Sequence, residues 1–243
     1  MREKVTTMGV YHVLNRGVDK RKIFLDKGDH LRFIHDLFEF NDIEPARNVG
    51  YYFPVHPKQL APEGRRQSID VRRQYMQGKQ APRKLLVDIL AFCLMPNHYH
   101  LMVRPHSEDG IALFMKKLNA GYAKYFNEKY EREGALFKGR YKLVSIQTNA
   151  HFVHISYYIH CNPLDLYAPS WRKREIESAN RALHFLEQYR WSSFPDYIGS
   201  KNFPSVTQRE FLTKFLGSTE QYRKDVVAWL REAEQQFDIP TLE

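Results

Sequence analysis

The order of hydrophobic and polar residues along the chain predicts strands that alternate with helices. Residues 9–15 and 85–95 are apolar stretches of strand length. A turn sequence, Met-Pro-Asn, follows the second stretch and leads into another strand at residues 98–104. We therefore predict an antiparallel hairpin over residues 85–104.

Several segments have hydrophobic residues at helical spacing. We expect Asp29 to cap a helix with the apolar positions Leu31, Ile34, Leu37 and Phe38. Ser107 is expected to cap a second helix, whose stripe is Ile111, Phe114, Leu118, Tyr122 and Tyr125. A third helix is predicted to open at Asn149 and to stop near Pro163. Residues 172–189 and 208–236 also have a helical pattern, and residues 134–146 look like a strand pair or an extended arm.

This arrangement predicts an α+β fold with a mainly antiparallel sheet. The chain's length of 243 residues and its hydrophobic fraction of 43% are sufficient for a packed core and exclude overall disorder. We expect one domain over residues 1–200, with an insert at about 45–84 and a helical C-terminal extension over 201–243.

The charge balance points to a polyanionic partner. The chain has 37 Lys and Arg against 28 Asp and Glu, a net charge of +9. The predicted insert holds nine basic residues against two acidic ones, a net +7, and either grips nucleic acid or is a solvated loop. Charge alone leaves DNA, RNA and an acidic membrane surface open.

Other features of the sequence narrow the setting. No apolar run is long enough to span a membrane, and the N-terminal residues lack the apolar centre of a signal peptide. The two cysteines, Cys93 and Cys161, make no disulfide framework. We therefore expect a cytoplasmic protein without a membrane partner.

The first candidate for chemistry is the pair His98 and His100. Side chains alternate between the faces of a strand, so both imidazoles point to one side while Tyr99 points to the other and can pack. Two imidazoles placed in this way can share a metal ion. A His-x-His pair is by itself weak evidence, because structural histidines also fall two apart.

The second candidate lies on the helix that ends near Pro163. Residues four apart share a helix face, so Tyr158 lies beside Asn162, whose amide oxygen can complete a His-His-Asn metal site. The alternative is a buried aromatic helix that Asn162 merely caps. Two nitrogen ligands and an amide oxygen suit Mg²⁺ or Mn²⁺. A tyrosine hydroxyl beside such an ion is a candidate nucleophile toward phosphorus.

These segments carry a resemblance to a known family. LMPNHYHLMV at residues 94–103 and YIHCNP at 158–163 resemble the two signature segments of single-tyrosine HUH transposases, in which two histidines flank a hydrophobic residue. Three further segments resemble the branch of REP-associated tyrosine transposases. These are YHVLNRG at 11–17, GALFKGRYK at 134–142 and WSSFPDYIG at 191–199. All five occur in the family's order.

The resemblance implies a ferredoxin-like fold, with the histidines on a central antiparallel sheet and the tyrosine on a packed helix. It implies a metal-dependent nickase and strand transferase that acts on single-stranded DNA beside a hairpin of repetitive, palindromic character. By position, Tyr158 is the catalytic nucleophile and forms a 5′-phosphotyrosine link, while His98, His100 and Asn162 hold Mg²⁺ or Mn²⁺. The branch is thought to act as a monomer, which we prefer over a homodimer.

The sequence departs from the family pattern in its long basic insert, in Tyr99 between the two histidines, and in a second tyrosine beside the first. We favour Tyr158 over Tyr157 as the nucleophile because only Tyr158 has Asn162 four residues later. The rival hypothesis is a domesticated protein that binds hairpin DNA without turnover.

The predicted DNA contacts combine basic residues, which pair with phosphates, and aromatic rings, on which unpaired bases stack. We expect them at Arg16, Arg104, Phe137, Lys138, Arg140, Tyr141 and Lys142. An ordinary strand with a solvated face is the alternative for residues 137–142.

Overall fold

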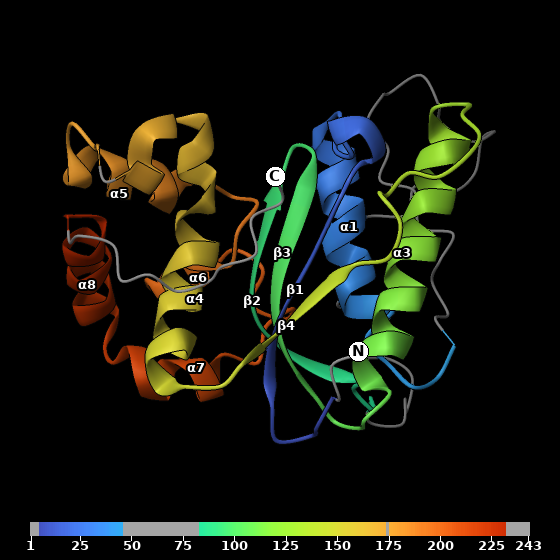
Figure 1. Ribbon diagram of the computed structural model, residues 1–243, viewed down its shortest axis with the longest axis horizontal. Coiled ribbons are helices and arrows are strands. Elements are labelled where there is room, and N and C mark those ends of the chain that lie inside the picture. The colour runs from blue at the N-terminus through green and yellow to red at the C-terminus, as the bar shows by residue number, and fades with distance from the viewer. Residues whose placement is uncertain (1–4, 46–82, 174, 232–243) are drawn as a thin grey trace, which may run out of the picture.

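The computed structural model describes residues 5–45, 83–173 and 175–231. Its centre is a four-stranded sheet in the order β2-β3-β1-β4, and every neighbouring pair of strands is antiparallel (Figure 1). The four strands are β1 (Val10–Arg16), β2 (Val87–Met95), β3 (His98–Pro105) and β4 (Lys142–Ile146). The prediction of an α+β fold with an antiparallel sheet is confirmed.

The connections give the sheet a ferredoxin-like topology. Helix α1 (Lys27–Glu39) follows β1, the hairpin of β2 and β3 comes next, and α3 (Gly110–Lys129) leads into β4. This is the β-α-β-β-α-β order in which each helix crosses over one face of the sheet. Most of the predicted insert at 45–84 lies outside the described residues, as does any helix within it.

Helices cover both faces of the sheet (Figure 1). Helices α1 and α3 lie on one face and α4 (Asn149–Cys161) on the other, where the chain after α4 joins it. The helical elements of that later part are η2 (Asn162–Leu166), η3 (Pro169–Lys173), α5 (Ala179–Gln188), α6 (Phe194–Tyr197), α7 (Arg209–Leu216) and α8 (Thr219–Arg231).

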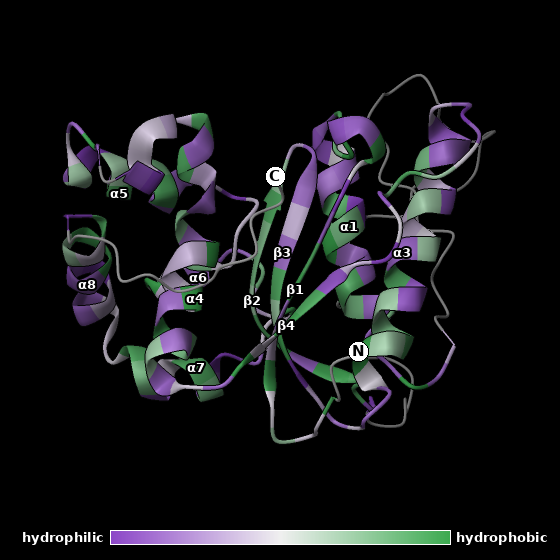
Figure 2. Ribbon diagram, viewed as in Figure 1, coloured by the Kyte–Doolittle hydropathy of each residue, from purple (hydrophilic) through white to green (hydrophobic). Residues whose placement is uncertain are grey.

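Burial on both faces explains why β2 is hydrophobic at nearly every position, as Figure 2 shows. Its residues alternate between two cores. Phe92 and Leu94 pack toward α1 and α3, whereas Cys93 and Met95 pack toward α4 and the C-terminal helices. A strand buried on one face alone would alternate polar and apolar residues instead.

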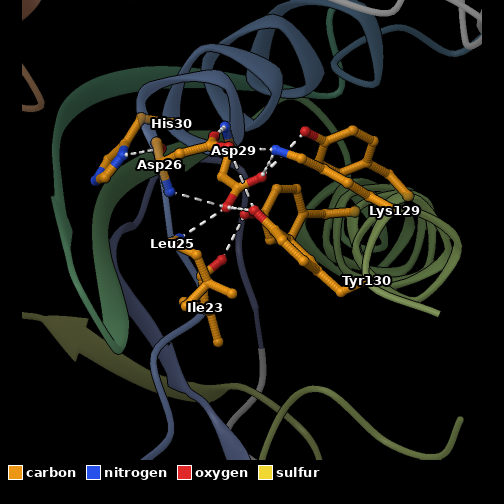
Figure 3. Close-up of polar contacts among 9 residues, drawn as sticks. Ile23, Leu25, Asp26, Asp29, His30, Lys129 and Tyr130 are labelled. Atoms are coloured by element: carbon orange, nitrogen blue, oxygen red, sulfur yellow. Dashed lines mark hydrogen bonds and ion pairs between the residues drawn. The ribbon is translucent and has the colours of Figure 1, made fainter. Parts of the chain in front are cut away.

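The core beneath α1 and α3 encloses a polar network around Asp29 (Figure 3). The carboxylate is fully buried, and it accepts hydrogen bonds from the backbone N–H of Leu25 at 2.7 Å, the hydroxyl of Tyr130 at 2.8 Å and the ammonium of Lys129 at 2.7 Å. Asp26 accepts from Lys129 as well, at 2.8 Å. The network ties the start of α1 to the end of α3.

Two helix caps differ from the prediction. Asp26, rather than Asp29, is the N-cap of α1, and Asp29 is the third residue of the helix and closes a capping box with it. In α3 the N-cap position belongs to Asp109, and Ser107 donates a hydrogen bond to its carboxylate at 2.6 Å. In each case several polar residues compete for one cap, and the turn geometry decides between them.

The remaining predicted elements are shorter than their sequence patterns. β4 occupies only the end of the segment 134–146. The pattern over 208–236 divides into α7 and α8 at Gly217, whose φ of 72° lies in the left-handed region that glycine tolerates. No helix among the described residues is both long enough and apolar enough to cross a membrane.

The C-terminal helices pack onto α4 as part of one core. His160 on α4 is fully buried and hydrogen-bonds the hydroxyls of Tyr222 on α8, at 2.5 Å, and of Ser193, at 2.9 Å. Burial lowers the pKa of His160 to about 3, so it is neutral at pH 7. The division into domains at residue 200 stays a prediction.

Candidate active site

The two histidines of β3 share one face of the sheet, as their spacing predicts. The rings of His98 and His100 lie 5.0 Å apart between centroids, nearly perpendicular to each other. Tyr99 points to the opposite face, is fully buried there and donates a hydrogen bond to Asn119 on α3 at 2.7 Å. The ring of Tyr99 therefore fills the place of the usual aliphatic residue between the histidines.

Hydrogen bonding fixes which nitrogen of His98 carries the proton. Asn97 donates its side-chain amide to the carbonyl of Lys20 at 3.3 Å, which turns the Asn97 oxygen toward His98 Nδ1 at 2.7 Å. Burial lowers the pKa of His98 to about 4, so the neutral ring has one proton. Since the oxygen can only accept, that proton is on Nδ1 and Nε2 presents a lone pair.

Asn162 brings an oxygen to that lone pair. It follows α4 directly, at the start of η2, and its Oδ1 lies 3.3 Å from His98 Nε2. Both atoms are acceptors in this arrangement. The Asn162 side chain is fully buried, and its Nδ2 has no hydrogen-bond partner among the described residues. Two acceptors that face each other in a buried site are compatible when a cation lies between them.

His12 on β1 also lies at this site, although it was not among the predicted site residues. Its Nε2 lies 2.8 Å from Nδ1 of His100, and the two rings stack at 5.1 Å. Because this hydrogen bond occupies Nδ1 of His100, Nε2 of His100 is the nitrogen that remains free to bind a metal ion. Burial is the main cause that lowers the pKa of His12 to about 3 and that of His100 well below its usual value.

The signal that would have found His12 is the pairing register. His12 pairs with Met102 on β3, two residues from His100, and paired residues of antiparallel strands point to the same face. The sequence shows that both segments are strands, but it does not show that they are neighbours.

Tyr158 joins the histidines from α4. Its ring lies 5.6 Å from His100 and 6.0 Å from His12 between centroids. Tyr157 points elsewhere, because its ring packs against Tyr222 and Trp229 in the C-terminal core. The structure thus brings Tyr158 and not Tyr157 to the histidine face.

Arg172 and Asp165 form a salt bridge beside the ring of Tyr158. Arg172 of η3 donates to both carboxylate oxygens of Asp165, from Nε at 3.0 Å and from Nη2 at 2.7 Å. Its guanidinium carbon lies 5.0 Å from the centre of the Tyr158 ring. Neither residue of this pair was among the predicted site residues.

The residues expected to contact DNA fall into two groups. Arg16 ends β1 directly opposite His98 in the register, and the backbone N–H of Lys138 donates to its carbonyl at 2.8 Å. Lys138, Arg140 and Lys142 are exposed and Tyr141 is half-buried. This group therefore lies beside the histidine end of β1 and β3, and its role in binding stays a prediction.

Phe137 and Arg104 form the second group, and their roles in binding DNA stay predictions. Phe137 is 7% exposed and packs against the rings of Tyr99 and Tyr122, so it has no free face for a base. Arg104 is six residues from His98 along β3, about 20 Å at strand rise, and donates two hydrogen bonds to Asp88. In the sequence, all of these basic and aromatic residues looked equally suited to contact DNA. Their exposure in the structure distinguishes them.

The donor set fits a hard divalent cation. His98, His100 and Asn162 offer two nitrogens and one amide oxygen, and no thiolate joins them. Within the described part of the chain, no group of three His, Cys, Asp or Glu side chains is arranged to hold a metal. Any ion at this site therefore depends on the amide of Asn162 as its third protein ligand.

Comparison with known proteins agrees with the motifs. Residues 66–162 match the family model of IS200-like transposases, and the matched segment contains both the histidine pair and Tyr158. No curated protein matches the chain. One solved structure that it resembles is the "Structure of the REP associates tyrosine transposase bound to a REP hairpin", at 10% identity and a TM-score of 0.46, over 85% of this chain and 88% of that one. The family model supports the predicted resemblance over residues 66–162.

Proposed function

We propose that this chain, whose residues 66–162 match the family model of IS200-like transposases, cuts and rejoins single-stranded DNA through Tyr158. The observation that carries the proposal is the meeting of three elements. β3 supplies His98 and His100, η2 supplies Asn162, and α4 supplies Tyr158, all on one face of the sheet.

Tyr158 acts as the nucleophile in the proposed reaction. Its hydroxyl oxygen forms a bond to phosphorus as the P–O3′ bond of the DNA breaks, and its proton passes to water. The electron pair of the broken bond stays on O3′, which takes up a proton and leaves as a free 3′-OH. The product is a 5′-phosphotyrosine link. Attack by a 3′-OH on this link reverses the reaction and rejoins DNA, so no nucleotide cofactor is needed.

His98 Nε2, His100 Nε2 and Asn162 Oδ1 are the atoms that would hold Mg²⁺ or Mn²⁺. Such an ion polarises a phosphate oxygen and offsets the charge that develops on it. The protein's own part is to keep both histidines neutral. Burial does this by lowering the pKa of each ring, and the Asn97 and His12 contacts orient them.

The substrate we propose is single-stranded DNA beside a hairpin, as for REP-associated transposases. The five ordered sequence segments that resemble this branch support the proposal. So do the basic residues beside the histidines, the half-buried Arg16 and the exposed Lys138, Arg140 and Lys142. Contacts to phosphates would make binding depend strongly on salt and weakly on sequence. We propose that the protein works as a monomer, which sedimentation of the DNA complex would test.

The test is covalent capture of DNA. Short inverted repeats that flank the gene are synthesised as 5′- and 3′-labelled single strands and incubated with the protein and Mn²⁺. We expect an adduct resistant to denaturant that carries the DNA 3′ of the cut and is absent with chelator. Tyr158→Phe should abolish it. Tyr157→Phe is the matched control, since this neighbour packs against Tyr222 and should retain cleavage.

The alternative function, binding of hairpin DNA without turnover, has a distinct result. Wild type and Tyr158→Phe would bind the repeat equally tightly, and neither would form an adduct at any metal concentration. An adduct that persists in Tyr158→Phe would instead show that another residue is the nucleophile.

A further inference from the structure

The short segment after α4 builds a rigid acid–base pair against Tyr158. Asp165, three residues after Asn162, accepts two hydrogen bonds from Arg172 and a third from the indole N–H of Trp171 at 2.6 Å. A bidentate bond holds the guanidinium plane in one orientation. The Trp171 side chain is buried and adds a second constraint, because Arg172 lies 4.6 Å over its ring.

This fixed guanidinium faces the tyrosine. Its carbon lies 5.0 Å from the ring centre of Tyr158. A guanidinium has five N–H donors. The two bonds to Asp165 leave three, which are available to the tyrosine oxygen and to a phosphate that approaches it.

The position of Arg172 suits a role in the reaction. Its side chain is 35% exposed, so it borders the solvent from which DNA must arrive, while Tyr158 beside it is 6% exposed. The cation is therefore placed to offset negative charge on the tyrosine oxygen.

We propose that Arg172 is a further catalytic residue, which donates hydrogen bonds to the Tyr158 oxygen and stabilises the negative charge that develops there as the hydroxyl proton leaves. Asp165 is its positioning residue. The inference rests on the proposed function and adds a group to the same site, beyond the segment that matches the transposase family. Arg172 keeps its proton throughout. The bonds made and broken are those of the tyrosine reaction above.

The chemistry explains why a cation is needed at this place. A phenol with an ordinary pKa near 10 is mostly protonated at neutral pH and is a weak nucleophile. A preorganised donor directed at developing charge accelerates a reaction by about 10²–10³-fold.

The experiment is single-turnover cleavage of a saturating hairpin oligonucleotide in Mn²⁺ from pH 6 to pH 10. We expect Arg172→Gln to slow adduct formation about 100-fold at pH 7, and the deficit to shrink as the pH rises because hydroxide then ionises the tyrosine. The dissociation constant for DNA should change less than about threefold. Arg172→Lys should restore part of the rate, since it retains the charge without the fork.

Two further variants separate catalysis from structure. Asp165→Asn keeps the size of the anchor but weakens its hold, and we expect a loss of about tenfold with the same change in pH profile. Arg181→Gln is the matched control, because this arginine forms an exposed pair with Glu177 and should leave the rate unchanged. Thermal unfolding of each variant within a few degrees of wild type shows that the fold is retained.

The outcomes distinguish the inference from the proposed function. An Arg172→Gln protein that cleaves within threefold of wild type, with an unchanged pH profile, overturns the role of Arg172 and leaves Tyr158 as the nucleophile. A loss of DNA affinity that accounts for the whole loss of rate also overturns it, because Arg172 would then only grip phosphate. If wild type forms no adduct at all, both proposals fail together.

Discussion

Both faces of the sheet are buried, and each carries a cluster of buried polar groups. The two clusters differ in how completely their polar atoms are hydrogen-bonded. Under α1 and α3, the buried Asp29 carboxylate is bonded by backbone, ammonium and hydroxyl donors from two helices. Under α4, the amide nitrogen of Asn162 has no hydrogen-bond partner among the described residues, and nor does Nδ1 of His12.

This difference distinguishes a polar cluster that packing alone explains from one that a ligand would complete. A buried polar atom without a partner costs about 1–3 kcal/mol, so folding alone favours the pattern around Asp29. Residues that leave hydrogen-bonding capacity unused in a core are expected where a ligand completes the arrangement. The cluster with unused hydrogen-bonding capacity is the one in which His98, His100 and Asn162 meet Tyr158.

The largest expected effect is on the functional face. We predict that His98→Ala and His100→Ala each reduce the rate of Mn²⁺-dependent DNA cleavage by about 10²–10³-fold, because a metal ligand contributes several kcal/mol to the stabilisation of charge on phosphate. In a Mn²⁺ titration of cleavage, each variant should need a higher Mn²⁺ concentration to reach its half-maximal rate. His106→Ala, at the other end of β3 and beside Asp88, is the control and should keep full activity.

The next effect belongs to the structural face. Asp29→Ala removes the partner of Lys129 and a member of the capping box, so we predict a loss of about 2–4 kcal/mol in the free energy of unfolding. Urea unfolding measures it. Cleavage per folded molecule should be unchanged, and a loss of cleavage in fully folded protein would contradict the separation of the two faces. Lys124→Ala, in an exposed pair with Glu128, should cost no more than about 0.5 kcal/mol.

A smaller effect is expected at the second layer of the site. His12 touches Nδ1 of His100 and orients its ring, so His12→Phe should weaken Mn²⁺ binding and cleavage by about 10–100-fold while the fold is retained. Isothermal titration with Mn²⁺ gives the affinity directly. Wild-type affinity in this variant would mean that His12 only fills space.

The smallest effect concerns the pH dependence of stability on the structural face. Burial lowers the pKa of His30, which stacks between Phe24 and Trp191, while the nearby Asp26 and Asp29 raise it. The unfolded chain therefore binds more protons, and this contribution to stability falls as the pH drops below about 6.5. His30→Phe should flatten the stability of the protein between pH 6.5 and 5. An unchanged slope in thermal unfolding at these pH values would count against it.

The sequence predicted the strands and the central motifs well. Strands β2 and β3 appear as the hairpin expected from two apolar runs around Met95-Pro96-Asn97, and the spacing of His98 and His100 placed both on one face. The four-residue interval between Tyr158 and Asn162 brought both to the histidines. These features depend on local periodicity, which a sequence shows directly.

The contacts of several residues could not be read from the sequence. Phe137 was expected to stack on DNA bases and Arg104 to bind phosphate, yet the first packs on Tyr99 and the second pairs with Asp88. His12 and Arg172 were not predicted at all. Each of these outcomes depends on a contact between residues distant in the sequence.

By itself, the sequence determined the motifs, the alternation of strands and helices, and the residue types available for chemistry, since all of these follow from composition and short-range spacing. Only the tertiary structure decided which of two adjacent tyrosines meets the histidines, that β1 brings His12 to His100, and that Asp165 holds Arg172 beside Tyr158. The pairing of strands and the docking of α4 depend on burial summed over the whole core. No short segment of the chain contains that sum.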